Sequence, residues 1–258
     1  MSGFQGNFVW YELMTTDAAA AEAFYRDVAG WGARDAGQEN MAYTLMLAEE
    51  TPVAGVMALP KEASALGARP GWMGYVAVDD VDAYAERVAR AGGKLHRPAA
   101  DIPGIGRFAI VADPQGVVFA LFKGTPGAMP PPPAAPGKAG YFGWRELVAT
   151  DWEAAFGFYS GLFGWTKAET HDMGPMGVYQ VFAAGGEAIG GMMTRPAGVP
   201  APFWMYYVLV DGIEAAVSRL KAGGGSVVNG PLQVPGGSWI VQALDPQGAT
   251  FALVSPHA

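Results

Sequence analysis

An internal repeat constrains the fold of this chain more than any other feature. Three separated blocks recur in the same order. Residues 10–31 (WYELMTTDAAAAEAFYRDVAGW) align with 144–165 (WRELVATDWEAAFGFYSGLFGW) at an offset of 134 (144 − 10), and residues 70–82 and 112–122 align with 202–214 and 244–254 at an offset of 132 (202 − 70). Chance does not produce such ordered self-similarity, so the sequence predicts two copies of one domain.

A proline-rich segment separates the two copies. Residues 124–140 read GTPGAMPPPPAAPGKAG, in which four successive prolines favour a stiff extended conformation. We therefore predict a first domain at residues 1–124, a linker at 125–139 and a second domain at 140–258. A tandem copy supplies a covalently attached partner, so we also expect the two domains to pair as an intrachain pseudo-dimer, with a homodimer as a further option.

Composition excludes several classes of function. The net charge is −8 and there is no basic run, so neither nucleic acid nor an anionic membrane surface is an expected partner. The absence of cysteine excludes disulfides, thiolate metal sites and cysteine nucleophiles. The first residues, MSGFQGNFVWYE, do not resemble a signal peptide, and no apolar run approaches the ~20 residues of a membrane span. We expect a soluble, cytoplasmic protein.

The pattern of strands and helices also repeats within each copy. In the first copy, strand-like segments occur at 8–14, 42–48, 53–58, 72–78, 107–112 and 117–122, and helical segments occur at 18–28 and 81–91. Asp17 is placed to cap the first helix, and the DPQG sequence at 113–116 is typical of a turn. Four βαβββ modules per chain predict an α+β fold, with two cup-shaped mixed β-sheet domains and helices on their outer face.

This arrangement resembles the vicinal-oxygen-chelate superfamily, which comprises glyoxalases, bleomycin resistance proteins and dioxygenases. The resemblance rests on an Asp–helix–Phe-Tyr–Gly-Trp block, a Val-Asp–helix–Gly-Gly block and the DPQG hairpin. The first block is Asp17, Phe24, Tyr25, Gly30 and Trp31 in one copy, and Asp151, Phe158, Tyr159, Gly164 and Trp165 in the other. The pattern is most similar to two-domain bacterial glyoxalase-like or hydroxylase-like proteins, which implies a small-molecule pocket inside each cup.

The resemblance also implies where metal ligands would stand in metal-dependent members. In the first copy, three of the four positions are occupied by Trp10, Met73 and Ala120, and the fourth falls near Gly55. In the second copy, they are occupied by Trp144, Met205 and Ala252, and the fourth falls near Gly191. Divalent ions prefer oxygen or imidazole donors, which tryptophan, alanine and glycine side chains do not supply. We therefore expect no metal cofactor, with a divalent metal as the alternative.

Glu12 and Glu146 are the candidate catalytic residues. Each follows the tryptophan at the first ligand position by two residues, so on a strand both side chains lie on one face. A carboxylate facing an apolar cup would have a raised pKa and could act as a general base. The alternative is a structural carboxylate that caps a loop or pairs with an arginine such as Arg107.

Several aromatic residues are candidates for ligand binding, because an aromatic face suits a flat ligand. They are Trp10, Trp144, Trp72, Trp204, Tyr75 and Tyr207. Trp72 and Tyr75 have odd spacing and point to opposite faces of a strand, so one set can line a cup while the other packs under the helices. His171 stands in the Gly-rich loop ETHDMGPMGVY, which has no counterpart in the first copy. It is either a surface or loop histidine without a ligand, or part of a lid over the second cup.

Three functions remain open at this point. The chain could bind a small apolar or aromatic molecule in metal-free cups. It could be a lyase or oxidoreductase of the glyoxalase or dioxygenase kind that uses Glu12 or Glu146 as a base, or a non-standard metal site. It could also be an assembly or regulatory module whose cups are filled by its own side chains. A fold alone does not choose between these alternatives.

Overall fold

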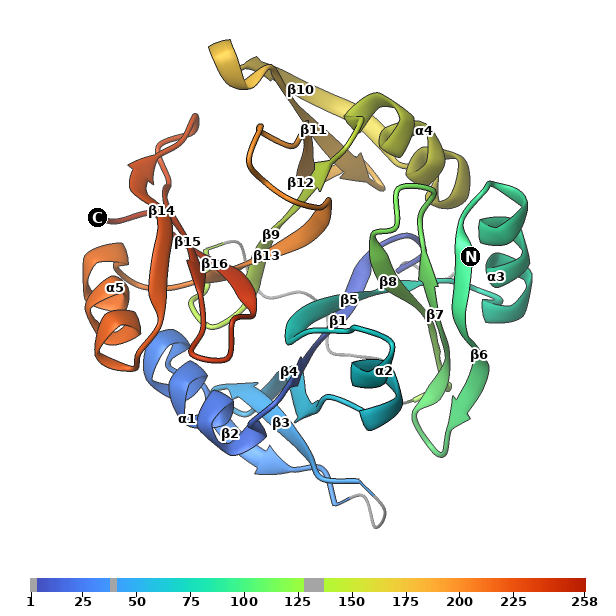
Figure 1. Ribbon diagram of the computed structural model, residues 1–258, viewed down its shortest axis with the longest axis horizontal. Helices are drawn as coiled ribbons and strands as arrows, with labels where there is room; N and C mark the ends of the chain where they lie inside the picture. Colours follow the sequence, from blue (N-terminus) through green and yellow to red (C-terminus); the bar gives the residue numbers. More distant parts are fainter. Residues whose placement is uncertain (1–3, 38–40, 128–136) are drawn as a thin grey trace. The chain divides into compact units, whose positions relative to one another are not determined.

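A computed structural model describes residues 4–37, 41–127 and 137–258, and it confirms the α+β fold with four βαβββ modules (Figure 1). The proline-rich middle of the expected linker, residues 128–136, lies outside the described residues. None of the described helices is long and apolar enough to cross a membrane.

The first copy contains two modules. The first module is β1 (Phe8–Thr15), α1 (Ala18–Ala29), β2 (Gly32–Asp35), β3 (Tyr43–Ala48) and β4 (Thr51–Ala58), followed by the short helix α2 (Lys61–Ala65). The second is β5 (Gly71–Ala77), α3 (Val81–Arg90), β6 (Lys94–Ile102), β7 (Gly106–Ala112) and β8 (Val118–Gly124). Their strands form a mixed sheet in the order β2-β3-β4-β1-β5-β8-β7-β6.

The second copy repeats this plan. Its first module is β9 (Phe142–Ala149), α4 (Trp152–Phe163), β10 (Thr166–Asp172), the 3-10 turn η1 (Gly174–Met176), β11 (Val178–Ala184) and β12 (Glu187–Thr194). Its second module is β13 (Phe203–Leu209), α5 (Ile213–Ala222), β14 (Ser226–Gln233), β15 (Trp239–Leu244) and β16 (Thr250–Ser255). The strand order is β10-β11-β12-β9-β13-β16-β15-β14.

Local sequence explains how the helices begin and end. The Asp17 side chain accepts a hydrogen bond from the Ala20 amide at 3.0 Å, which confirms the predicted cap of α1, and Asp151 does the same for α4. Gly30 and Gly164 end these two helices in the left-handed conformation, at φ of 71° and 72°. Such φ values favour glycine, which explains why both copies place Gly directly before Trp.

Packing divides the chain differently from the repeat. The chain folds into two compact units. Unit one consists of the described residues within 1–9, 73–130 and 144–204, and unit two consists of those within 10–72, 131–143 and 205–258. Each unit therefore joins one module of each copy. In unit one α3 lies beside α4, and in unit two α1 lies beside α5 (Figure 1).

Arginines join the helices inside each unit. In unit two, Arg219 on α5 donates from Nε to the Asp27 carbonyl at 2.7 Å and from Nη2 to the Val28 carbonyl at 3.1 Å. In unit one, Arg87 on α3 donates to the carbonyls of Gly161 and Leu162, at 3.0 and 3.1 Å. The last carbonyls of α1 and α4 have no partners within their own helices, so each arginine satisfies a helix C-terminus from a neighbouring helix.

A buried hydrogen-bond chain lies in the aromatic core of each unit. In unit two, the Trp72 indole donates to the Tyr25 hydroxyl at 2.9 Å, and that hydroxyl donates to Asp245 at 3.1 Å. In unit one, the Trp204 indole donates to the Tyr159 hydroxyl, which donates to Asp113, at 3.1 and 3.2 Å. Burial is the main cause that raises the pKa of both aspartates, and their hydrogen bonds oppose it.

Candidate functional site

In unit two, three side chains from β1 and β3 form a hydrogen-bonded chain that we call triad one. The Trp10 indole Nε1 donates to the Tyr43 hydroxyl at 2.9 Å. The Tyr43 hydroxyl donates to Glu12 Oε2 at 3.0 Å. An indole N–H can only donate, so the phenol oxygen accepts from Trp10 and directs its own proton to the carboxylate.

Unit one contains the same arrangement on β9 and β11, which we call triad two. The Trp144 indole donates to the Tyr179 hydroxyl at 2.7 Å, and that hydroxyl donates to Glu146 Oε2 at 3.1 Å. The two glutamates are the candidate catalytic residues of the sequence analysis, and the two tryptophans are the residues at its first ligand position. The structure thus brings Trp and Glu together in each unit through a tyrosine.

The triads combine a buried acid with aromatic groups that reach the surface. Glu12 and Glu146 are 8% and 6% exposed, whereas the tryptophans and tyrosines are half-buried. Burial, followed by the charge of the neighbouring glutamate, raises the pKa of Tyr43 and of Tyr179 above the ordinary value. Both phenols therefore stay neutral at physiological pH and act as hydrogen-bonding groups rather than as bases.

Each phenol lies in the space left by a glycine that has no side chain. Gly55 on β4 is the register partner of Glu12 on β1, and a Cβ atom at Gly55 would overlap the Tyr43 hydroxyl. Gly191 on β12 faces Glu146 in the same way, and a Cβ there would overlap the Tyr179 ring. The phenol thus lies where a side chain at the middle ligand position would begin, and only glycine leaves that space open.

Apolar side chains continue the face around each triad. In unit two, strand register places half-buried Met14, Leu45 and Met57 next to the triad: Met14 and Tyr43 both pair with Met57, and Leu45 pairs with Gly55. In unit one, Val148, Val181 and Met193 hold the corresponding positions. Flexible thioethers and aromatic rings adapt well to flat apolar ligands.

The residues at the superfamily's metal-ligand positions do not fit a metal. Trp10, Met73 and Ala120 offer no oxygen or imidazole donor, and the phenol of Tyr43 takes the space over Gly55. Trp144, Met205 and Ala252 in the second copy also offer no oxygen or imidazole donor, and the phenol of Tyr179 takes the space over Gly191. Within the described part of the chain there is also no group of three or more His, Cys, Asp or Glu that could hold a metal ion.

The other predicted aromatic residues are all buried. Trp72 and Trp204 belong to the buried core chains described above, which favours the packing role left open by the sequence. Tyr75 is buried beside the rings of Phe108 and Phe122. Tyr207 is buried, and its hydroxyl accepts a hydrogen bond from the side-chain amide of Gln242 at 2.8 Å. Both residues pair with Ala252, which lies on the strand between theirs.

Two further expectations concern charged residues. Arg107 binds Asp82 and Asp101, at 2.7 and 2.9 Å, so it is not the partner of Glu12 that the structural alternative suggested. His171 is on β10, 31% exposed, with Nε2 3.5 Å from Glu169 Oε2. Its register partner on β11 is Tyr179 of triad two. The expected loop at 169–179 is therefore wrong in part, because 169–172 belong to β10 and 178–179 to β11, where backbone pairing holds them in the sheet. That the segment closes over the second cup as a lid stays a prediction.

Sequence reasoning missed Tyr43 and Tyr179, although the repeat contained a signal for them. Both tyrosines and both glycines are separated by an offset of 136 (179 − 43 and 191 − 55), so each tyrosine precedes its glycine by the same interval. This offset differs from the 134 and 132 of the three aligned blocks, because the second copy has extra residues between α4 and β11. A tyrosine and a glycine recurring together would have indicated a ring packed over a missing side chain.

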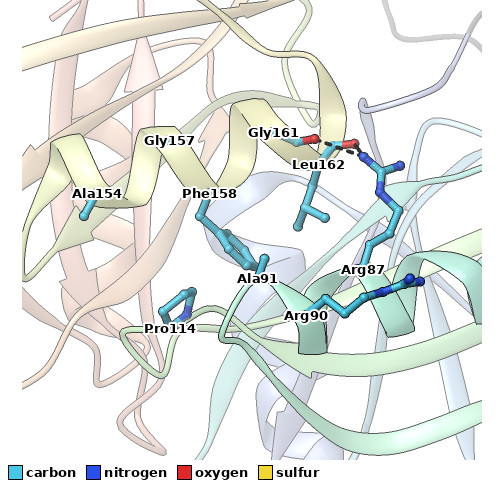
Figure 2. Close-up of a pocket in the computed structure, with 9 residues that line it drawn as sticks. All are labelled: Arg87, Arg90, Ala91, Pro114, Ala154, Gly157, Phe158, Gly161 and Leu162. Carbon is cyan, nitrogen blue, oxygen red and sulfur yellow. Dashed lines mark hydrogen bonds between the residues drawn. The ribbon is translucent and has the colours of Figure 1, made fainter.

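An open hollow of about 650 Å³ lies between α3 and α4 of unit one, away from the triads (Figure 2). At the corresponding place in unit two, the Phe24 ring lies close to Gly223, where a Cβ would be 2.9 Å from the ring. Unit one has Ala91 at that position, beside Phe158 (Figure 2). The hollow therefore reflects looser helix packing, and we do not assign it the chemistry of the triads.

Comparisons of the sequence and of the structure with known proteins identify similar proteins over nearly the whole chain. A family model described as Glyoxalase/Bleomycin resistance protein/Dioxygenase superfamily matches residues 7–121 and 141–253. The "Putative glyoxylase CFP32" of Mycobacterium tuberculosis is 33% identical over 257 residues, which are 98% of this chain and 95% of that protein. The anthracycline biosynthesis protein DnrV of Streptomyces peucetius is 33% identical over 260 residues, 95% of this chain and 91% of DnrV.

Solved structures share the fold. The Mn(II)-bound glyoxalase of Novosphingobium aromaticivorans has a TM-score of 0.64 at 19% identity, over 99% of this chain and 83% of that one. The 2,3-dioxygenase LapB of Pseudomonas sp. KL28 has a TM-score of 0.66 at 13% identity, over 98% and 93%. With the family match over both copies, these findings establish that the chain belongs to the glyoxalase/bleomycin resistance protein/dioxygenase superfamily.

Proposed function

We propose that this protein binds a small planar aromatic molecule that carries a hydroxyl group, and that it does so at triad one and triad two without a metal. The single observation that carries the proposal is the Trp→Tyr→Glu hydrogen-bond chain, which occurs in both units at half-buried aromatic residues.

The direction of the chain selects the ligand. Because the phenol proton points to the glutamate, the phenol oxygen and the carboxylate can only accept hydrogen bonds from a further partner. A ligand that donates, such as a phenol, complements these acceptors. Trp10, Met14 and Met57 in unit two, and Trp144 and Met193 in unit one, offer the apolar surface on which its ring would lie.

The relatives support an aromatic ligand. Two of them, DnrV of Streptomyces peucetius and DauV of a Streptomyces strain, are named as anthracycline biosynthesis proteins, and both match 95% of this chain. Anthracyclines contain flat hydroxylated rings. The names do not identify the ligand here, but they agree in chemical class with what the triads would accept.

The test compares 2-naphthol with 2-methoxynaphthalene by isothermal titration calorimetry. Methylation keeps the ring and the oxygen but removes the donor, so 2-naphthol should bind at least about 5-fold tighter, as expected for one hydrogen bond of ~1 kcal/mol. The double variant Tyr43→Phe/Tyr179→Phe should weaken this preference, because it removes one of the two acceptors of each triad and leaves the carboxylate. Tyr141→Phe, at a half-buried tyrosine outside both triads, is the matched control and should keep it.

Two results would overturn the proposal. One is the absence of binding of any ring compound to the parent protein. The other is an unchanged preference in the double tyrosine variant. Elemental analysis of the same preparation should show well below one equivalent of Mn, Fe, Zn or Ni per chain, and a full equivalent lost with Glu12→Ala or Glu146→Ala would favour a metalloenzyme.

An enzymatic role is the second candidate, because each triad holds a buried carboxylate beside half-buried rings. Glu12 or Glu146 would then accept a proton from a bound substrate while the neutral tyrosine positions the carboxylate. Prolonged incubation with hydroxyaromatic and hydroxyquinone compounds, followed by mass spectrometry, distinguishes binding from turnover. A module with filled cups, the third candidate, corresponds to the result in which nothing binds.

A further inference from the structure

We infer that the two triads recognise different ligands and that His171 determines the difference, by giving triad two a hydrogen bond to a second polar oxygen of its ligand. This inference rests on the proposed function, since it concerns the ligand of the same sites.

The two sites agree at their centres. Trp10, Glu12, Tyr43, Gly55 and Met57 in unit two correspond one for one to Trp144, Glu146, Tyr179, Gly191 and Met193 in unit one. The contacts agree as well, because both chains of hydrogen bonds run from indole to phenol to carboxylate. Any difference in recognition must therefore come from the residues around this centre.

Most of the surrounding differences exchange one apolar residue for another. Met14 in unit two corresponds to Val148 in unit one, and Leu45 corresponds to Val181. Such exchanges alter the shape of the face but add no hydrogen-bonding group. Arg34 on β2 is exposed and pairs with Leu45, two residues away from the tyrosine. The difference directly beside the tyrosine is on the same neighbouring strand, and it changes the hydrogen-bonding groups of the site.

In unit one, that neighbouring residue is His171. It is paired with Tyr179 across the antiparallel β10 and β11, and paired residues project their side chains from the same face of a sheet, with Cβ atoms ~5 Å apart. In unit two, the residue next to Tyr43 is Ala36, whose amide donates to the Tyr43 carbonyl at 2.9 Å. A methyl group therefore stands where triad two has an imidazole.

The imidazole supplies what the triad lacks. The phenol oxygen and the carboxylate only accept hydrogen bonds from a ligand, whereas a histidine ring has two nitrogens that donate or accept. Nε2 of His171 lies 3.5 Å from Glu169, which is exposed, and Nδ1 makes no hydrogen bond to any residue that the structure describes. Because His171 is itself 31% exposed, a ligand stacked beside Tyr179 can reach it.

The chemistry of the two ligands follows from these groups. Triad one, with Ala36, suits an aromatic ring with a hydroxyl group alone. Triad two, with His171, suits an aromatic ring that carries a hydroxyl group and, at another edge, a carbonyl or second hydroxyl oxygen. The structure thus assigns His171 as a specificity-determining residue.

Single-site variants make the inference testable. Gly55→Ala would push the Tyr43 phenol off Glu12 and disable triad one, and Gly191→Ala would disable triad two. In each case the displaced atoms are the far end of a flexible side chain, so the fold should tolerate the change. Gly32→Ala and Gly157→Ala are matched controls, one in each unit, because an added Cβ meets only ordinary contacts at Gly32 and none at Gly157.

The probes are 2-naphthol, which has one hydroxyl group, and 6-hydroxy-2-acetylnaphthalene, which adds a carbonyl. In the Gly55→Ala background, where triad two is intact, the acetyl compound should bind about 5- to 10-fold tighter, as one hydrogen bond implies. Adding His171→Ala should bring this ratio close to one, and adding His171→Gln, which keeps a donor and an acceptor, should retain part of it.

The converse experiment uses the Gly191→Ala background, where triad one is intact. The two probes should bind there with similar affinity, and adding Ala36→His should create a preference for the acetyl compound. An unchanged ratio in His171→Ala, in protein that melts normally, would overturn the inference while leaving the proposed function standing. If 2-naphthol binds to neither background nor to the parent, the proposed function fails and the inference fails with it.

Discussion

Tyr43 and Tyr179 occupy the space in which the side chain of another residue would start. In each unit a phenol lies over a glycine and occupies the space of the side chain that the glycine lacks. The same phenol receives a hydrogen bond from an indole and gives one to a glutamate. At the residue scale, the pairing of tyrosine with glycine is therefore what defines the site.

A double-mutant cycle tests this pairing. Gly55→Ala should lower the free energy of unfolding by about 1–3 kcal/mol, because the displaced Tyr43 loses two hydrogen bonds of roughly 0.5–1.5 kcal/mol each. In a Tyr43→Ala background, the same Gly55→Ala change should cost nothing, because the Cβ then enters an empty space. Urea unfolding of the four proteins measures the coupling, and strictly additive effects would contradict the pairing.

The neutral phenols predict a loss of stability at alkaline pH. The pKa values of Tyr43 and Tyr179 are raised in the folded protein, and a tyrosine in the unfolded chain titrates near 10. Their contribution is complete below about pH 10. Above it the unfolded state releases protons that the folded state retains, so the free energy of unfolding falls as pH rises.

Unfolding in urea between pH 8 and 11 checks this prediction. The parent should lose stability above about pH 10, and Tyr43→Phe/Tyr179→Phe should lose it less steeply, with buried Tyr25 accounting for part of the remainder. Equal slopes for the parent and the double variant would show that these phenols do not titrate as the structure implies.

At the scale of elements, the buried chains explain two motifs that the sequence showed without a reason. The Phe-Tyr pair in α1 and α4 provides Tyr25 and Tyr159, and each DPQG turn provides the aspartate that accepts from one of them. The aspartates also accept hydrogen bonds from their own turns, at the amides of Gln247 and Ala249 for Asp245. Each motif thus connects a helix of one module to a turn of another.

Tyr25→Phe should therefore destabilise the protein by about 1–3 kcal/mol. The change removes a hydrogen bond from Asp245 and leaves the Trp72 indole N–H without its acceptor in a buried position. Tyr141→Phe, where no hydrogen bond is broken among the described residues, is the control and should change the stability by less than about 0.5 kcal/mol. Thermal or urea unfolding compares the two, and an equally small effect at Tyr25 would refute the argument.

The sequence predicted central elements better than edge elements. Strands such as β1 and β8 carry apolar residues that end up buried, and Asp17 caps α1 as expected. The edge strands β2 and β6 were missed, because their side chains are mostly exposed and show no apolar alternation. The same limit applied to the triads: Trp10 and Glu12 were found by position, whereas the contact with Tyr43 depends on strand pairing that local pattern does not encode.

At the scale of the whole molecule, the repeat and the packing follow different divisions. The repeat divides the chain at the linker, but unit two needs residues 10–72 of the first copy and 205–258 of the second. The Tyr25–Asp245 bond and the Arg219 contacts to α1 hold these segments together.

A split protein should reveal this dependence. Residues 1–124 expressed alone lack Asp245, Arg219 and the rest of α5, so α1 would expose Phe24 and Tyr25. We expect this fragment and residues 140–258 each to be aggregation-prone or partly folded alone, and to form a native-like complex when mixed. Circular dichroism and size-exclusion chromatography measure both properties, and two stable, non-interacting fragments would contradict the prediction.

The crossed composition of the units has a consequence for synthesis on the ribosome. Every segment of unit one has been made once residue 204 is added, whereas unit two must wait for residues 205–258, a further 54 residues (258 − 204). At roughly 5–20 residues per second, the nascent chain holds the aromatic surface of residues 10–72 uncovered for ~3–11 s while unit one is already able to close. Residues 10–72 are thus made well before the segment that buries them, and the segment around Phe24 and Tyr25 is where a chaperone would be expected to bind the growing chain.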